Sequence, residues 1–192
     1  VERSRGLGDV YKRQPSLQAA FIEFGTEKKA FLPFDEIHPS YFKIPHNEKV
    51  LVNGGQKNNE IDDEKENKKH FLSFYRKYKI QDVIKKDQVL LIQIVKEERG
   101  TKGAAVTTFI SLPGRYSVLL PNNSSTGGVS KKISNPLDRK RLKRLHDNFN
   151  LPDGMSLIIR TNAISAEDED IIADFSYLRK LWTKIREDTL KS

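Results

Sequence analysis

Short apolar runs separated by polar turns recur along the chain. They are rich in β-branched and aromatic residues, as strands are. The clearest is QVLLIQIV at residues 88–95, which charged residues bound on both sides. The other runs that predict strands are residues 17–24, 29–34, 104–112, 116–120 and 155–161. The stretches KEERGTKG (96–103) and PNNSSTGG (121–128) have the composition of turns.

Helical spacing appears in the second half of the chain. Asn135 and Pro136 have the residue types favoured at a helix start, and Leu142 and Leu145 continue as one apolar face. Lys and Arg crowd the other faces. These features predict a basic helix over residues 136–149.

A second helix is predicted at the end of the sequence. Ser165 followed by Asp168 resembles a capping box, and apolar residues then keep helical spacing from Ile171 onwards. Acidic residues gather at the start of this helix and basic ones in its second half, which suits the helix dipole.

Residues 53–70 form a charged insert with almost no apolar side chains, and we expect a mobile loop there. The pattern at 71–78 is compatible with a short helix or a strand. Residues 80–86 favour a helical turn before the strand at 88–95.

Residues 1–14 have neither a helical nor a strand pattern. The string DVYKRQ at 9–14 is the translation of a common sequencing adaptor, so we interpret this segment as an artefact. We expect it to be disordered and outside the fold. The alternative is an ordinary basic arm.

Charge narrows the range of partners. The 192 residues include 34 Lys and Arg against 26 Asp and Glu, a net charge of +8. This balance indicates nucleic acid first and an anionic membrane second, although many basic proteins bind neither. No apolar run is long enough to span a membrane, and no secretory signal pattern occurs, so a cytoplasmic location is expected.

Catalytic motifs are missing from the sequence. We find no phosphate-binding loop, nucleophile elbow or zinc-protease motif, and the acids at 62–66 lack calcium-loop spacing. Without cysteine, thiolate metal sites and disulfides are excluded within this chain. The histidines are scattered: they are His38, His46, His70 and His146. We therefore expect neither a catalytic residue nor a metal site here.

Aromatic residues lie beside basic ones on the predicted strands. Phe21 and Phe31 fall on two strands joined by a tight turn, so they can lie across from each other, whereas Phe24 points to the opposite face. Lys102 lies in a turn flanked by glycines. Bases stack on such rings while a lysine meets the phosphate, as on the surface of an OB-type barrel. The alternative is that these phenylalanines belong to the core.

Five segments carry a family resemblance. PSLQAAFIEFGTEKKAFLPF (15–34) and IVKEERGTKGAAVTTFISL (94–112) resemble the S1-type RNA-binding domain of the ribonuclease E/G family. GRYSVLLPNN (114–123), residues 127–133 and LIIRT (157–161) resemble the sensor subdomain that follows. The strings EERG and PNN look closer to the ribonuclease E branch than to the ribonuclease G branch.

The resemblance implies an α+β fold. An OB-type, S1-like five-stranded barrel would occupy residues 15–112, incomplete at its first strand, with the insert at 53–70. A small α+β sensor region, RNase H-like and partial, would occupy 113–192.

The resemblance also implies roles on the barrel. Phe21 and Phe31 would form the aromatic platform, and Lys102 would hold the RNA backbone. Phe24 stands where the family often has tyrosine, so a hydroxyl contact would be lost.

In the sensor region, Arg160 and Thr161 match the pocket that grips a 5′-phosphate, and Gly114 and Val118 match its lining. A guanidinium fork with a hydroxyl suits a terminal phosphate. Lys131 and Lys132 replace an arginine pair, which keeps the charge for backbone contacts but not the bidentate geometry.

The implied parent is an endoribonuclease of RNA processing and decay that acts on single-stranded, preferably 5′-monophosphorylated RNA. Its Mg²⁺- and Zn²⁺-binding catalytic part has no counterpart in this sequence, so the chain alone should not cleave RNA. A homotetrameric parent is implied, with membrane or degradosome association through other regions.

Two alternatives stay open. The chain could be a free-standing S1-type RNA-binding module with no nuclease role. It could also be an interaction protein that binds an acidic partner through the basic helix at 136–149.

Overall fold

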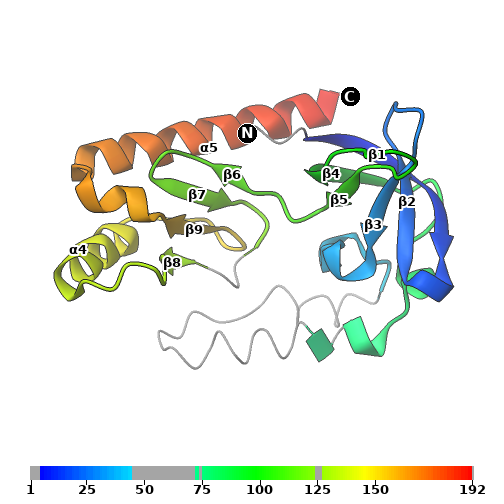
Figure 1. Cartoon of the computed structure of the whole chain (residues 1–192), viewed down its shortest axis with the longest axis horizontal. Coiled ribbons are helices and arrows are strands. Elements are labelled where there is room, and N and C mark those ends of the chain that lie inside the picture. The colour runs from blue at the N-terminus through cyan, green and yellow to red at the C-terminus, as the bar shows by residue number, and fades with distance from the viewer. Residues whose placement is uncertain (1–4, 45–71, 74, 124–126, 192) are drawn as a thin grey trace. The chain divides into compact units, whose positions relative to one another are not determined.

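The computed structural model describes residues 5–44, 72–73, 75–123 and 127–191. The chain divides into two compact units, Val1–Phe109 and Ile110–Ser192 (Figure 1). The division falls close to the boundary expected between residues 112 and 113.

The first unit contains a closed barrel in the strand order β1-β2-β3-β5-β4. All neighbouring pairs are antiparallel except β3 and β5, which are parallel. Its strands are β1 (Arg5–Gln14), β2 (Ala19–Glu23), β3 (Ala30–Pro33), β4 (Val89–Lys96) and β5 (Ala105–Thr107). A five-stranded closed barrel of this kind confirms the predicted OB-type fold.

Strand β1 corrects two expectations, because residues 1–14 were expected to be disordered and the barrel to lack its first strand. Instead, Arg5–Gln14 pairs with β2 on one side and β4 on the other. Gly8 and Val10 are buried with exposed Asp9 between them, a short alternation that the polar composition concealed. Gly8 is required by space, since a Cβ there would lie 2.4 Å from Ile22 Cγ2.

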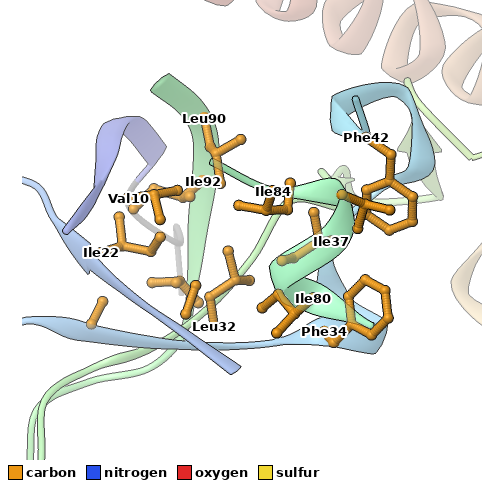
Figure 2. Packing of buried hydrophobic residues seen from close by; sticks show 14 of the residues in the cluster. Val10, Ile22, Leu32, Phe34, Ile37, Phe42, Ile80, Ile84, Leu90 and Ile92 are labelled. Atoms are coloured by element: carbon orange, nitrogen blue, oxygen red, sulfur yellow. The ribbon is translucent and has the colours of Figure 1, made fainter. Parts of the chain in front are cut away.

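The barrel core brings together side chains from strands and from the segments that close one end (Figure 2). The strands contribute Val10, Ile22, Leu32, Leu90 and Ile92. The elements that close this end are η2 (Phe34–Glu36), η3 (Pro39–Tyr41) and α3 (Ile80–Val83), whereas η1 (Pro15–Leu17) contributes no buried residue. These three elements and the residues directly after them add Phe34, Ile37, Phe42, Ile80 and Ile84 to the cluster.

Tyr75 packs against the segments that close this end of the barrel. Its hydroxyl donates a 2.5 Å hydrogen bond to the Ile37 carbonyl, and its ring contacts Phe34 and Phe42 edge-on. Burial raises the pKa of Tyr75 far above its ordinary value, and the carboxylates of Asp35 and Glu36 add to the rise. The residue is therefore a neutral hydrogen-bond donor.

The second unit is a four-stranded sheet with helices. The strand order is β6-β7-β9-β8, in which only β8 and β9 are parallel. The strands are β6 (Leu112–Pro113), β7 (Ser117–Leu120), β8 (Gly128–Val129) and β9 (Ser156–Ile159). The helices are α4 (Pro136–Asp147), η4 (Thr161–Ser165) and α5 (Asp168–Lys191). Helix α4 packs against β8 and β9, and α5 packs against β6 and β7 (Figure 1).

Local chemistry decides where the elements begin and end. The Asn135 side chain accepts from the backbone N–H groups of Leu137 (2.9 Å) and Asp138 (3.3 Å), which confirms the predicted cap of α4. The capping box predicted at Ser165 is wrong, because Ser165 ends η4 and α5 begins at Asp168.

The single strand predicted over 104–112 is interrupted between β5 and β6. The Thr108 hydroxyl donates to the Glu36 carbonyl at 2.9 Å, and the Phe109 N–H donates to the Thr107 hydroxyl at 3.0 Å. The bond within Thr107–Phe109 is local and that to Glu36 is long-range, and both replace the hydrogen bonds of a continuous strand ladder.

The charged insert at 53–70 lies outside the described residues. Within 71–78, where the pattern was ambiguous, the described residues 72–73 and 75–77 are helical. Over the described ranges, no helix has both the length and the apolar character needed to cross a membrane.

Candidate nucleic-acid interface

Phe21 and Phe31 form a cross-strand pair on the outside of the barrel. They lie opposite each other in the β2–β3 register, with ring centroids 5.9 Å apart and planes at 66°. Each is half-buried, whereas the adjacent residues Ala20, Ile22 and Leu32 are buried in the core. The alternation of strand faces therefore turns the two rings outward.

Lys102 reaches the same part of the barrel from a distant segment. The backbones of Arg99 and Lys102 form a two-bond bridge, and Lys28 Nζ donates to the Gly100 carbonyl at 2.5 Å. Two residues further on, the Ala104 carbonyl accepts from the Phe31 N–H at 2.8 Å. The exposed Lys102 thus lies in a turn that hydrogen bonds hold beside β3, the strand that carries Phe31.

Phe24 is not brought to the Phe21–Phe31 pair. It is partly buried and packs against the barrel core. This position agrees with its expected direction, opposite to that of Phe21.

One end of the second unit's sheet collects the residues that the sequence singled out there. Strand β9 pairs with β7 in antiparallel and with β8 in parallel orientation. The first residue of β7 therefore lies at the same end of the sheet as the last residues of β8 and β9. Gly114, Arg160, Thr161 and Lys131 all lie at or next to these strand ends.

Arg160 is joined to the loop that connects β6 and β7. Its Nη1 donates to the Gly114 carbonyl at 2.7 Å, and its backbone N–H donates to the Tyr116 carbonyl at 2.8 Å. Arg160 and Thr161 are both exposed. A guanidinium has five N–H donors, and one of those of Arg160 bonds to the Gly114 carbonyl. The other donors can face a ligand.

Val118 lies within β7, paired with Ile158 of β9. It is half-buried, while its neighbours Ser117 and Leu119 point to the buried side. Val118 therefore supplies an apolar surface on the side of the sheet opposite to the helix-covered core.

Lys131 and Lys132 follow β8. The Ser130 N–H donates to the Ile159 carbonyl at 2.9 Å, which fixes the start of this turn beside the end of β9. Arg139 of α4 holds it from the other side by donating to the Ser130 carbonyl at 3.1 Å. Both lysines are exposed.

Asp174 was not identified from the sequence, although its carboxylate accepts four hydrogen bonds near this end of the sheet. Its carboxylate accepts from the backbone N–H groups of Arg115, Tyr116 and Ser117 and from the Ser117 hydroxyl. A signal was present, because Asp174 interrupts the apolar stripe of Ile171, Phe175 and Leu178 on α5.

In the part of the chain that the structure describes, no group of three histidines, cysteines or carboxylates is arranged to hold a metal ion. The residues singled out from the sequence lie in two places. Phe21, Phe31 and Lys102 lie on or beside β2 and β3 of the barrel, and Arg160 and Thr161 follow the end of β9 in the second unit.

The chain is thus a protein with an OB-type barrel that carries outward aromatic residues, followed by an α+β subdomain. Comparison with known proteins adds a family match. The model of the ribonuclease E/G family matches residues 111–192. The chain is 38% identical over 179 residues to ribonuclease E of Escherichia coli strain K12, covering 93% of this chain and 14% of that protein.

Two further relatives agree. Identity is 37% over 179 residues with a putative ribonuclease E of Buchnera aphidicola subsp. Baizongia pistaciae, covering 93% of this chain and 37% of that protein. It is 34% over 192 residues with ribonuclease G of Escherichia coli strain K12, covering 97% of this chain and 34% of that protein. The chain therefore matches the ribonuclease E/G family over most of its own length, and it spans only a minor part of the length of these relatives.

Proposed function

We propose that this chain is the RNA-binding and 5′-end-sensing part of an endoribonuclease. In this proposal the barrel binds single-stranded RNA, and the second unit recognises a 5′-monophosphate. The observation that carries the proposal is the gathering of Gly114, Arg160 and Thr161 at one sheet edge, in a chain of this family.

The barrel part of the proposal is supported by the outward pair of Phe21 and Phe31. Bases stack on aromatic faces regardless of sequence, and a neighbouring lysine neutralises the backbone. Lys102 is exposed and held beside β3, so it supplies this charge.

The sensing part is supported by the chemistry at Arg160. A terminal phosphate has more charge and more free oxygens than an internal phosphodiester, and a 5′-hydroxyl end has no phosphate at all. A guanidinium and a hydroxyl therefore bind a 5′-monophosphate end in preference to a 5′-hydroxyl end. Lys131 and Lys132 add positive charge near the same edge.

We further propose that cleavage, with Mg²⁺ and Zn²⁺, belongs to regions of the parent protein that this sequence does not include. The chain has no cysteine, and its described residues form no three-ligand cluster that would fit either metal. A cytoplasmic, homotetrameric parent that degrades and processes RNA, at the inner membrane face or in a degradosome, remains part of this proposal.

The test compares binding of two single-stranded RNAs of identical sequence, one with a 5′-monophosphate and one with a 5′-hydroxyl. We expect the wild-type chain to prefer the monophosphate and Arg160→Ala to reduce that preference by roughly tenfold or more. Arg186→Ala on the exposed side of α5 is the matched control, which removes the same charge elsewhere. An unchanged preference in Arg160→Ala would contradict the sensor assignment.

The same experiment separates the alternatives. RNA binding that depends on Phe31 but shows no 5′-end preference would favour a free-standing RNA-binding module. Binding to RNA that depends on neither Phe31 nor Arg160 would favour an acidic partner for α4, whose Lys140, Lys143 and Arg144 are exposed. Salt dependence would not distinguish these two, because both are electrostatic.

A further inference from the structure

The loop between β6 and β7 is held from the helix side by a single carboxylate. Asp174 Oδ1 accepts from the Arg115 N–H at 2.9 Å. Asp174 Oδ2 accepts from the N–H groups of Tyr116 (3.0 Å) and Ser117 (2.9 Å) and from the Ser117 hydroxyl (2.8 Å). Four donors therefore converge on one side chain of α5.

Three successive amide N–H groups that point to one spot are a ready-made anion site. Here the site is filled by the protein's own carboxylate, so its charge-assisted bonds fix the loop before any ligand arrives. Ser117 is fully buried, which excludes water from competing at its hydroxyl.

Gly114 adds a steric requirement to this arrangement. A Cβ at that position would lie 2.5 Å from Asp174 Oδ2 and 2.6 Å from Oδ1. The carboxylate is not free to move aside, because both oxygens are engaged with the loop. Only glycine lets the backbone approach Asp174 so closely.

The carbonyl groups of the same loop face the other way, toward the segment after β9. The Gly114 carbonyl accepts from Arg160 Nη1 and the Tyr116 carbonyl from the Arg160 N–H, at 2.7 and 2.8 Å. Asn162 Nδ2 also donates to the Arg115 carbonyl, at 3.4 Å. The loop thus connects Asp174 to the Arg160 guanidinium through alternating donors and acceptors.

We propose that Asp174 is a positioning residue for recognition of a 5′-terminal phosphate. By fixing the loop, it holds the Gly114 carbonyl where that carbonyl orients the exposed guanidinium of Arg160. Because Asp174 already occupies the loop amides, the phosphate binds on the side of Arg160 and Thr161 and not at those amides. This inference rests on the proposed 5′-end sensing, and the ligand class is an RNA with a terminal phosphate monoester.

The test uses the whole chain and the two RNAs described above, and measures the ratio of their dissociation constants. We expect Asp174→Ala to lower the wild-type preference for the monophosphate by about tenfold. Asp174→Asn should lower it less, about threefold, because its oxygen can still serve the donors at Oδ2 while its NH₂ opposes one of the amides. Affinity for the 5′-hydroxyl RNA should stay the same, since the barrel is untouched.

Two further variants keep the result interpretable. Ser117→Ala removes one of the four hydrogen bonds and should lower the preference about two- to fivefold, which gives a milder test should Asp174→Ala unfold. Asp170→Asn changes the same charge one turn earlier on α5, at an exposed position, and should change nothing.

A purely structural role would weaken binding of both RNAs equally, and that outcome would overturn the inference. So would a full wild-type preference in folded Asp174→Asn and Ser117→Ala together. A wild-type chain with no preference at all would instead overturn the proposed sensing function, and this inference with it.

Discussion

Phe21 lies directly opposite Phe31 in the antiparallel pair of β2 and β3, with their ring centroids 5.9 Å apart. The edge-to-face arrangement leaves part of each ring exposed, in a position where two bases can stack. The pair is therefore a cross-strand contact that also presents aromatic surface on the outside of the barrel.

We predict that Phe31→Ala and Phe21→Ala each weaken binding of single-stranded RNA by about 1–3 kcal/mol, the usual contribution of one stacked base. Fluorescence anisotropy with a short 5′-hydroxyl RNA measures the change. Tyr177→Ala removes an exposed aromatic residue from α5 and should leave the affinity unchanged. Wild-type affinity in both phenylalanine variants would show that the rings only pack against each other.

Lys102→Ala should weaken binding to all RNA sequences equally. If its ammonium contacts one phosphate, the slope of log K against log salt should become shallower by about 0.7, the value for one contact on a single strand. A salt titration of the wild-type and variant chains measures this slope. Lys86→Ala, which removes an exposed lysine from the turn before β4, is the control. Equal slopes for the wild-type and Lys102→Ala chains would remove Lys102 from the interface.

Gly8→Ala should destabilise the barrel, whereas Gly6→Ala should not. A Cβ at Gly8 would lie 2.4 Å from Ile22 Cγ2 and 3.2 Å from Ile92 Cδ1, but a Cβ at Gly6 has nothing within 4 Å. Overpacking of this kind costs about 1–3 kcal/mol. Thermal unfolding followed by circular dichroism compares the two variants. Equal stability of both would mean that β1 does not occupy this place in the barrel.

Arg141→Ala should destabilise the second unit by about 1.5–3 kcal/mol, the range for hydrogen bonds to a charged group. Its guanidinium donates to the carbonyls of Ala163, Ile164 and Ala166 and to the Asp168 carboxylate, which ties α4 to the start of α5.

Arg141→Lys should not restore this stability, because an ammonium cannot reproduce the planar fork. Lys140→Ala, at the exposed neighbouring position, is the control for chemical unfolding. A loss in Arg141→Ala no larger than that in Lys140→Ala would show that these bonds are replaced by water.

The features that could be predicted depend on local chemistry. Asn135 caps α4 as expected because its side chain needs only the next two or three backbone amides. The contact between Phe21 and Phe31 was expected because a short turn joins their strands. In both cases the partners are close in sequence.

The features that were missed depend on distant partners. Strand β1 has too few apolar residues to be recognised, and it is defined by pairing with β2 and with β4, far along the chain. Asp174 accepts hydrogen bonds from backbone amides 57 to 59 residues away, and no sequence pattern around Asp174 predicts these partners. Its only local sign was a carboxylate within an apolar stripe.

The position of β1 has a consequence for how the barrel forms during synthesis. β1 is synthesised before the other strands of the barrel, and its second neighbour, β4, is made only after β2, β3 and about fifty further residues, which takes several seconds at about 5–20 residues per second. During that interval one edge of β1 has no partner within the barrel, and open strand edges invite pairing with other chains. The nascent barrel therefore has an unpaired β1 edge until β4 has been synthesised.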